Sequence, residues 1–144
     1  MAYWDSSALL KVYISEPDSA YFDRVSTTEG PVVCSAIATT EVLCALHRKD
    51  RAGELQAGSA GTVFQKFLSD AESGRIQMIP YGSEVVVEAT RLVKLVFAQP
   101  RPVMLRALDA IHVSSALLAR AKVVVATDRR LRAAALVAGL RVLP

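Results

Sequence analysis

The sequence has few cysteines and no long hydrophobic run. Its two cysteines, Cys34 and Cys44, have no histidine pair nearby, which excludes a disulfide framework and a zinc site. The longest apolar stretches, 133–140 and 123–126, fall far short of the ~18 residues that a membrane span needs. The first residues lack the basic flank and the cleavage site of a signal peptide. We therefore expect a cytoplasmic protein that makes no contact with a membrane.

Glycine, proline and charged residues are also sparse. The 7 glycines and 6 prolines exclude collagen-like and low-complexity sequence. Apolar residues make up 52% of the chain and charged residues 22%, which excludes intrinsic disorder. The length of 144 residues predicts one domain that spans residues 1–144. Because so small a domain cannot bury all its apolar residues, the surplus predicts either scattered surface side chains or an interface with a partner.

Acidic residues are almost absent from the last third of the chain. Residues 1–90 hold 7 Lys and Arg against 12 Asp and Glu, whereas residues 91–144 hold 10 against 2. These two acids are Asp109 and Asp128. A strongly basic segment is either an ordinary solvated surface or the footprint of a polyanion such as nucleic acid.

Short apolar runs alternate with helical periodicity along the chain. We expect strands at 2–4, 32–34, 76–79, 123–126 and 141–143, and helices at 8–14, 17–25, 35–50, 55–73, 84–97, 105–120 and 128–138. Such alternation predicts an α/β fold with a parallel five-stranded sheet flanked by helices.

Two carboxylates follow predicted strands directly. Asp5 comes after residues 2–4, and Asp128 comes after the run that ends at Thr127. Each is either a helix N-cap or part of a site, because ligands of open α/β sheets bind beyond the carboxyl ends of the strands.

Two further carboxylates lie on predicted helices among apolar neighbours. Glu41 shares a helix face with Ile37 and Cys44, and Asp109 shares one with Leu105 and Val113. Because Asp and Glu are seldom buried alone, these two acids form ion pairs, with Arg48 and Arg106 as the candidates, lie at a partly exposed rim, or belong to a functional cluster.

Four converging carboxylates repel one another, and a hard cation such as Mg²⁺ or Mn²⁺ relieves that repulsion. Carboxylate-bound divalent metals support phosphodiester cleavage, and a basic surround would hold the flanking phosphates. The residues therefore point to a metal-dependent nuclease in which Asp5, Glu41, Asp109 and Asp128 are both catalytic residues and metal ligands.

Other polar residues have two interpretations each. Ser6 and Thr127 either support the cluster by hydrogen bonding or are ordinary residues at the ends of strands. His112 follows Asp109 by one helical turn, and we expect it to pack or to support the site rather than to act as a base. The basic residues that follow Asp128 either contact RNA phosphates or form a solvated helix face; they are Arg129, Arg130 and Arg132.

The sequence resembles the PIN domain, and specifically the VapC-like toxins of toxin–antitoxin pairs. Four segments carry the resemblance over essentially the whole chain: YWDSSALLKVYISE, SAIATTEVLCALHR, LRALDAIHVSSALLA and VVVATDRRLRAAALVAGLRV. Each is similar to one of the family's acidic motifs, with Asp5, Glu41, Asp109 and Asp128 in order as the acids. Residues 129–132 read Arg-Arg-Leu-Arg, so the further acid that some relatives carry there is missing.

The resemblance implies a PIN-like three-layer sandwich with the acids at the carboxyl edge of its parallel sheet. It implies Mg²⁺- or Mn²⁺-dependent cleavage of RNA, a homodimer, and a VapB-like antitoxin that sends an Arg or Lys into the acid cluster. Two alternatives remain open: a non-catalytic module that binds RNA or a partner, and a nuclease that acts on DNA.

Overall fold

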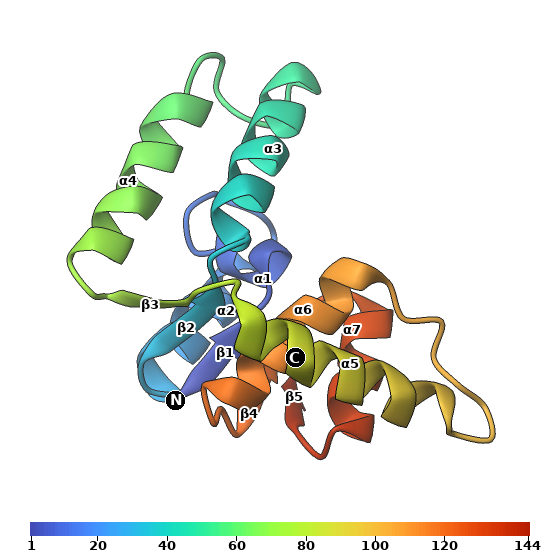
Figure 1. Cartoon of the computed structure of the whole chain (residues 1–144). Coiled ribbons are helices and arrows are strands. Elements are labelled where there is room, and N and C mark those ends of the chain that lie inside the picture. Colours follow the sequence, from blue (N-terminus) through green and yellow to red (C-terminus); the bar gives the residue numbers. More distant parts are fainter.

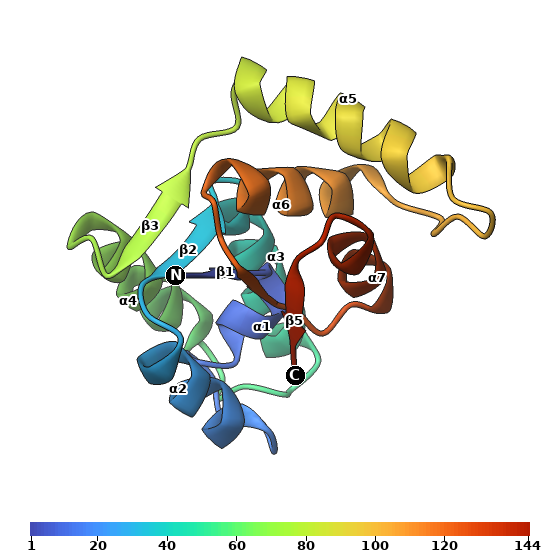
Figure 2. The same cartoon turned by 90° about the horizontal axis from the view of Figure 1, so that it is seen from below.

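The computed structural model describes all residues 1–144. Its centre is a five-stranded sheet in the order β3-β2-β1-β4-β5, with every neighbouring pair parallel (Figures 1 and 2). The strands are β1 (Ala2–Trp4), β2 (Val32–Ser35), β3 (Ile76–Ile79), β4 (Val123–Val125) and β5 (Arg141–Leu143). All five strands expected from the apolar runs are therefore present.

Helices cover both faces of this sheet. In Figure 2, α1 to α4 lie on one side and α5 to α7 on the other. Their bounds are α1 (Ser6–Leu10), α2 (Ser19–Thr28), α3 (Ala38–Arg51), α4 (Ala60–Glu72), α5 (Ser83–Phe97), α6 (Ala107–Leu118) and α7 (Arg129–Val137). The expected three-layer sandwich is thus confirmed. None of these helices combines the length and the hydrophobicity that crossing a bilayer requires.

The alternation of side chains along the strands divides the interior into two cores. Trp4 and Cys34 point to one face, where they pack with residues such as Leu9 and Phe67. Tyr3, which is in register with Val33, points to the opposite face and packs with the apolar residues of α5, α6 and α7. One strand therefore contributes to both cores.

The strand order reverses at β1. The chain first proceeds from β1 outward to β2 and β3, and then returns so that β4 lies on the other side of β1. Trp4 at the end of β1 is in register with Val125 at the end of β4. In open α/β sheets, ligands bind in the crevice beyond the strand ends at such a reversal.

The largest differences from the expected bounds occur in three helices. The first ends at Leu10 and passes into a turn rather than continuing to residue 14. Ser35 completes β2, and the following helix begins only at Ala38. The helix expected from residue 55 begins at Ala60, because residues 53–59 form turns in which Gly53 and Gly58 take positive φ angles of 74° and 76°.

Candidate active site

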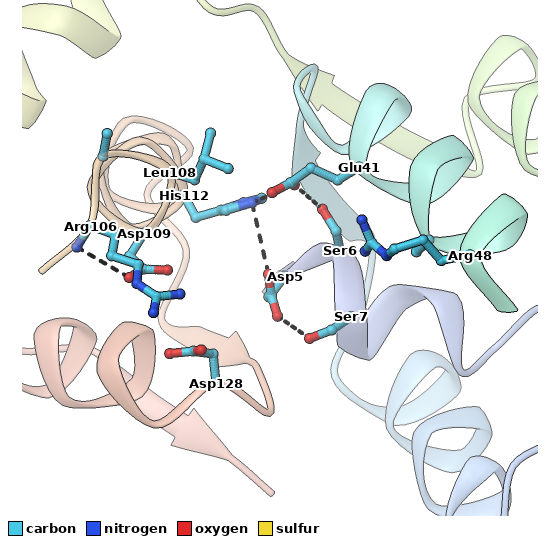
Figure 3. A pocket seen from close by; sticks show the side chains of 12 residues that line it. Asp5, Ser6, Ser7, Glu41, Arg48, Arg106, Leu108, Asp109, His112 and Asp128 are labelled. Atoms are coloured by element: carbon cyan, nitrogen blue, oxygen red, sulfur yellow. Dashed lines mark hydrogen bonds and ion pairs between the residues drawn. The ribbon is translucent and has the colours of Figure 1, made fainter. Parts of the chain in front are cut away.

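A pocket of about 610 Å³ lies at the carboxyl edge of the sheet, where β1 and β4 end (Figure 3). All four predicted carboxylates line it. The full lining is Asp5, Ser6, Ser7, Glu41, Ala45, Arg48, Arg106, Ala107, Leu108, Asp109, His112 and Asp128. The structure thus brings the four predicted acids to the lining of one pocket.

Each carboxylate lies at or near the N-terminus of a helix. Asp5 immediately precedes α1, and its backbone N–H donates to the carbonyl of Val125 at 2.9 Å. Glu41 and Asp109 lie in the first turns of α3 and α6, and Asp128 is the residue before α7. The positive ends of four helices therefore face the pocket, which favours negative charge there.

Asp5 and Glu41 form one half of the site. Ser6 and the Nε2 atom of His112 both hydrogen-bond to Oε2 of Glu41, and the His112 distance is 2.8 Å. Asp5 accepts a hydrogen bond from Ser7, and its Oδ1 atom lies 3.8 Å from His112 Nε2. His112 thus stands between these two carboxylates (Figure 3).

Asp109 and Asp128 form the other half of the site, and both carboxylates accept hydrogen bonds from backbone N–H groups. Asp109 accepts from the N–H of Arg106 at 3.3 Å. Asp128 accepts from the N–H groups of Arg130 and Leu131 at 2.7 and 3.2 Å, as an N-cap does. The cap interpretation therefore holds for Asp128. It fails for Asp5, whose side chain caps no backbone N–H.

The expected ion pairs do not form. Asp109 meets the backbone of Arg106 rather than its guanidinium, and Glu41 meets His112 and Ser6 rather than Arg48. Both acids are partly exposed, so a rim position and a clustered role are the interpretations that remain.

The four carboxylates supply the hard oxygen ligands that Mg²⁺ and Mn²⁺ prefer. In the present arrangement, however, no three His, Cys, Asp or Glu side chains are close enough together to hold one metal ion. Each carboxylate is instead hydrogen-bonded to a protein donor. The donor set fits a divalent cation, and binding one requires some of these side chains to move closer together.

Two of the acids are held at an electrostatic cost. Burial raises the pKa of Asp5 above its ordinary value, and the charge of Glu41 adds to this, although His112 and Ser7 partly oppose it. Burial likewise raises the pKa of Asp109, and the charge of Asp128 adds to the effect. Both ionised carboxylates are therefore less stable in the folded chain than in water.

Glu41 shows the opposite behaviour. Burial acts to raise its pKa, but the hydrogen bond and charge of His112, together with the hydrogen bond from Ser6, outweigh burial and lower the pKa below its ordinary value. The ionised form of Glu41 is therefore the favoured one.

The supporting residues proposed from sequence lie at different distances from the pocket. Ser6 lines it, whereas Thr127 does not; Thr127 instead lies 2.8 Å from the Ser7 hydroxyl, which in turn donates to Asp5. The three arginines at the start of α7, Arg129, Arg130 and Arg132, are outside the lining. Arg132 donates to the carbonyl of Pro144 at 2.8 Å.

Sequence reasoning missed three residues that line the pocket. Ser7 carries no signal beyond its place after Asp5. Arg48 and Arg106 were considered only as ion-pair partners, and neither guanidinium forms an ion pair. Both arginines are exposed and lie on opposite sides of the pocket (Figure 3).

The opposite pKa shifts predict opposite effects of two neutralising substitutions. At pH 7 in the presence of a chelator, Asp5→Asn should raise the melting temperature, because it removes a carboxylate whose pKa is raised by folding. Glu41→Gln should lower it, because folding favours the charged Glu41. A change of 1 kcal/mol corresponds to roughly 4 °C in a domain of this size.

Thermal unfolding followed by circular dichroism measures both effects, with the exposed Asp23→Asn as the matched control. The stabilisation by Asp5→Asn should shrink as the pH falls through the raised pKa of Asp5, since the wild-type carboxyl is then protonated. A lower melting temperature for Asp5→Asn at pH 7 would contradict this account of the site.

Known structures share this fold. The chain matches VapBC2 from Rickettsia felis bound to a promoter DNA fragment, with a TM-score of 0.68 and 14% identity over 99% of this chain and 98% of that one. A toxin–antitoxin complex from Klebsiella pneumoniae matches with a TM-score of 0.63 and 14% identity, over 100% and 97%. FitAcB from Neisseria gonorrhoeae matches with a TM-score of 0.64 and 15% identity, over 100% of this chain and 97% of that one. No curated protein sequence matches. The PIN domain family matches residues 2–136, and the chain therefore belongs to the PIN domain family.

Proposed function

We propose that residues 1–144 form a single nuclease domain that cleaves RNA phosphodiesters with a bound Mg²⁺ or Mn²⁺. One observation carries this proposal: four carboxylates from the beginnings of four helices line one pocket at the reversal of the strand order. Membership of the PIN domain family supports it.

Asp5 and Asp109 are the principal metal ligands in this proposal, and Glu41 and Asp128 complete the set. A divalent cation bound there lowers the pKa of bound water and stabilises the charge on the phosphodiester as it is cleaved. The raised pKa values of Asp5 and Asp109 support their assignment, because a cation relieves the cost of keeping both ionised. Ser6 donates to Glu41 and Ser7 donates to Asp5, which holds these two carboxylates at the pocket wall.

The unpaired guanidinium groups beside the pocket are suited to bind the phosphates that flank the cleaved bond. Arg48 and Arg106 approach it from α3 and from the residue before α6, and arginine binds phosphate oxygens in pairs. The basic residues at the start of α7 extend this surface beyond the pocket: Arg129, Arg130 and Arg132. Target choice would then depend on how this surface contacts the RNA.

Cleavage of a structured RNA by the purified protein tests the nuclease assignment. Wild type should cleave in Mn²⁺ and lose activity in a chelator. Asp5→Asn and Asp109→Asn should each reduce cleavage by more than about 100-fold, since residues that only support metal ligands already cost 10–100-fold. Asp23→Asn, on the exposed side of α2, should cleave normally. Undiminished cleavage by both site variants would exclude this active site.

The same assay separates the alternatives. DNA of the same sequence, tested in parallel, distinguishes a ribonuclease from a general nuclease, and RNA binding without any cleavage would favour a non-catalytic module. Arg48→Gln and Arg106→Gln should keep the Mn²⁺ affinity of wild type but weaken RNA binding, and each should reduce the slope of affinity against salt by about 0.7. Arg24→Gln, an exposed arginine without an ion pair, is the matched control.

We further propose that the chain is the toxin of a VapBC-type pair and that a VapB-like antitoxin inhibits it. The solved toxin–antitoxin complexes that share its fold support this role. The acidic pocket suits insertion of an Arg or Lys from the antitoxin, because a cation relieves the same repulsion whichever molecule carries it. We expect the toxin to act in the cytoplasm, where its RNA substrate is found.

Induced expression in growing cells tests the toxin role. Wild type should slow growth, Asp5→Asn should not, and co-expression of a VapB-like protein that binds the chain should restore growth. Normal growth on expression of an active wild-type nuclease would contradict a toxin role while leaving the nuclease assignment intact.

An apolar groove between α5 and α6 is the surface that we propose for a second copy of the chain. It has a volume of about 400 Å³ and includes Val86, Val93 and Ile111. Ala107 lines both this groove and the carboxylate pocket, so a dimer formed here would lie beside the active site. The exposed fraction of Val86 is 47%, which is high for a residue in an apolar groove.

Val86→Lys should therefore shift the protein from dimer to monomer in sedimentation experiments without lowering its melting temperature as a monomer. Val87→Lys is the matched control, since Val87 is 63% exposed on the same helix and lies outside the groove. A wild-type monomer at high concentration would contradict the dimer.

A further inference from the structure

A buried tyrosine and a buried histidine connect the centre of the sheet to the carboxylate pocket. Tyr3, in the central strand β1, is fully buried, and His112 of α6 is 1% exposed. The Tyr3 hydroxyl lies 2.7 Å from Nδ1 of His112, and Nε2 of His112 lies 2.8 Å from Oε2 of Glu41. Three elements, β1, α6 and α3, are thus joined by two short hydrogen bonds.

The proton positions in this chain follow from its donors and acceptors. The Tyr3 oxygen already accepts a hydrogen bond from the backbone N–H of Ser35 at 3.0 Å. A buried hydroxyl proton needs an acceptor, and of the two groups that hydrogen-bond to Tyr3 most closely, the Ser35 N–H and Nδ1 of His112, only Nδ1 can accept it. With Nδ1 accepting, the ring proton is on Nε2, which donates to Glu41. The Tyr3 hydroxyl therefore selects the tautomer of His112 that can hold the carboxylate.

The two oxygens of Glu41 have different surroundings. Oε2 accepts from both His112 and Ser6, whereas Oε1 accepts no hydrogen bond from the protein. The carboxylate is therefore fixed through one oxygen, and the other is free to bind a cation in the pocket that Glu41 lines. His112 Nε2 is also 3.8 Å from Oδ1 of Asp5, so the ring limits the movement of both carboxylates.

We propose that Tyr3 and His112 are positioning residues that hold Glu41 with its Oε1 atom available to the metal ion. This inference rests on the proposed metal-dependent function and assigns to two core residues a part in it. An apolar side chain at position 112 would leave Glu41 attached only through Ser6. One at position 3 would keep His112 but remove the hydrogen bond that fixes its tautomer.

Metal binding by the metal-free full-length protein tests the proposal without relying on activity. In calorimetric titrations with Mn²⁺, Tyr3→Phe should weaken the affinity by about 10-fold or more, as loss of a group that orients a metal ligand does. His112→Leu should have at least as large an effect. His112→Gln should recover part of the affinity, because its amide N–H can replace Nε2–H as the donor to Glu41.

Tyr13→Phe is the matched control for the loss of a tyrosine hydroxyl. Tyr13 donates to Asp70 at 2.7 Å and lines a different pocket, so its substitution removes a hydrogen bond of the same kind away from the site. It should leave the Mn²⁺ affinity unchanged. Equal Mn²⁺ affinities for wild type, Tyr3→Phe and Tyr13→Phe would overturn the proposal.

Nitrogen-15 NMR of the imidazole rings gives a second and independent measurement. The chain has only two histidines, His47 and His112, so His47→Gln assigns the spectrum. Wild-type His112 should show the Nε2–H tautomer, and Tyr3→Phe should lose this preference. A wild-type Nδ1–H tautomer would overturn the proposal. If wild type binds no Mn²⁺, the proposed metal-dependent function fails, and the tautomer still decides whether Tyr3 and His112 orient Glu41.

Discussion

Repulsion among four carboxylates in one partly buried pocket is the constraint on which the rest of the site depends. The fold reduces this repulsion by placing every acid at the beginning of a helix, where the helix dipole and free backbone N–H groups favour negative charge. The reduction is incomplete, because burial, together with the smaller effect of a neighbouring carboxylate, keeps the pKa values of Asp5 and Asp109 raised. The structure therefore retains part of the cost of gathering these charges, as functional sites in folded proteins commonly do.

The sheet topology explains why the acids meet although they are far apart in sequence. Asp5 and Asp128 follow β1 and β4, which are neighbours only because the strand order reverses at β1. Glu41 and Asp109 then reach the same edge from α3 and α6, which lie on opposite faces of the sheet (Figure 2). Each half of the sandwich thus contributes two elements to the pocket, and neither half contains the site alone.

The sequence was sufficient to predict which acids gather but not what holds them. Strands were predicted well because buried parallel strands appear as short continuous apolar runs. The acids were predictable because each stands at a junction or on an apolar helix face. Their partners were not, because hydrogen bonds such as that between Tyr3 and His112 join residues 109 positions apart. Helical spacing suggested an ion pair between Asp109 and the Arg106 guanidinium, whereas Arg106 donates to Asp109 through its backbone N–H.

The two halves of the pocket also differ in how firmly they hold their charges. Asp109 and Asp128 accept only backbone N–H groups at helix beginnings, and those donors keep their positions while the fold is intact. Glu41 and Asp5 depend on side chains, namely Ser6, Ser7 and His112, of which only the serines can rotate freely. His112 is fixed by Tyr3 from the core behind it. The half of the site with movable partners is therefore anchored to the central strand through the one side chain that bridges both of its carboxylates.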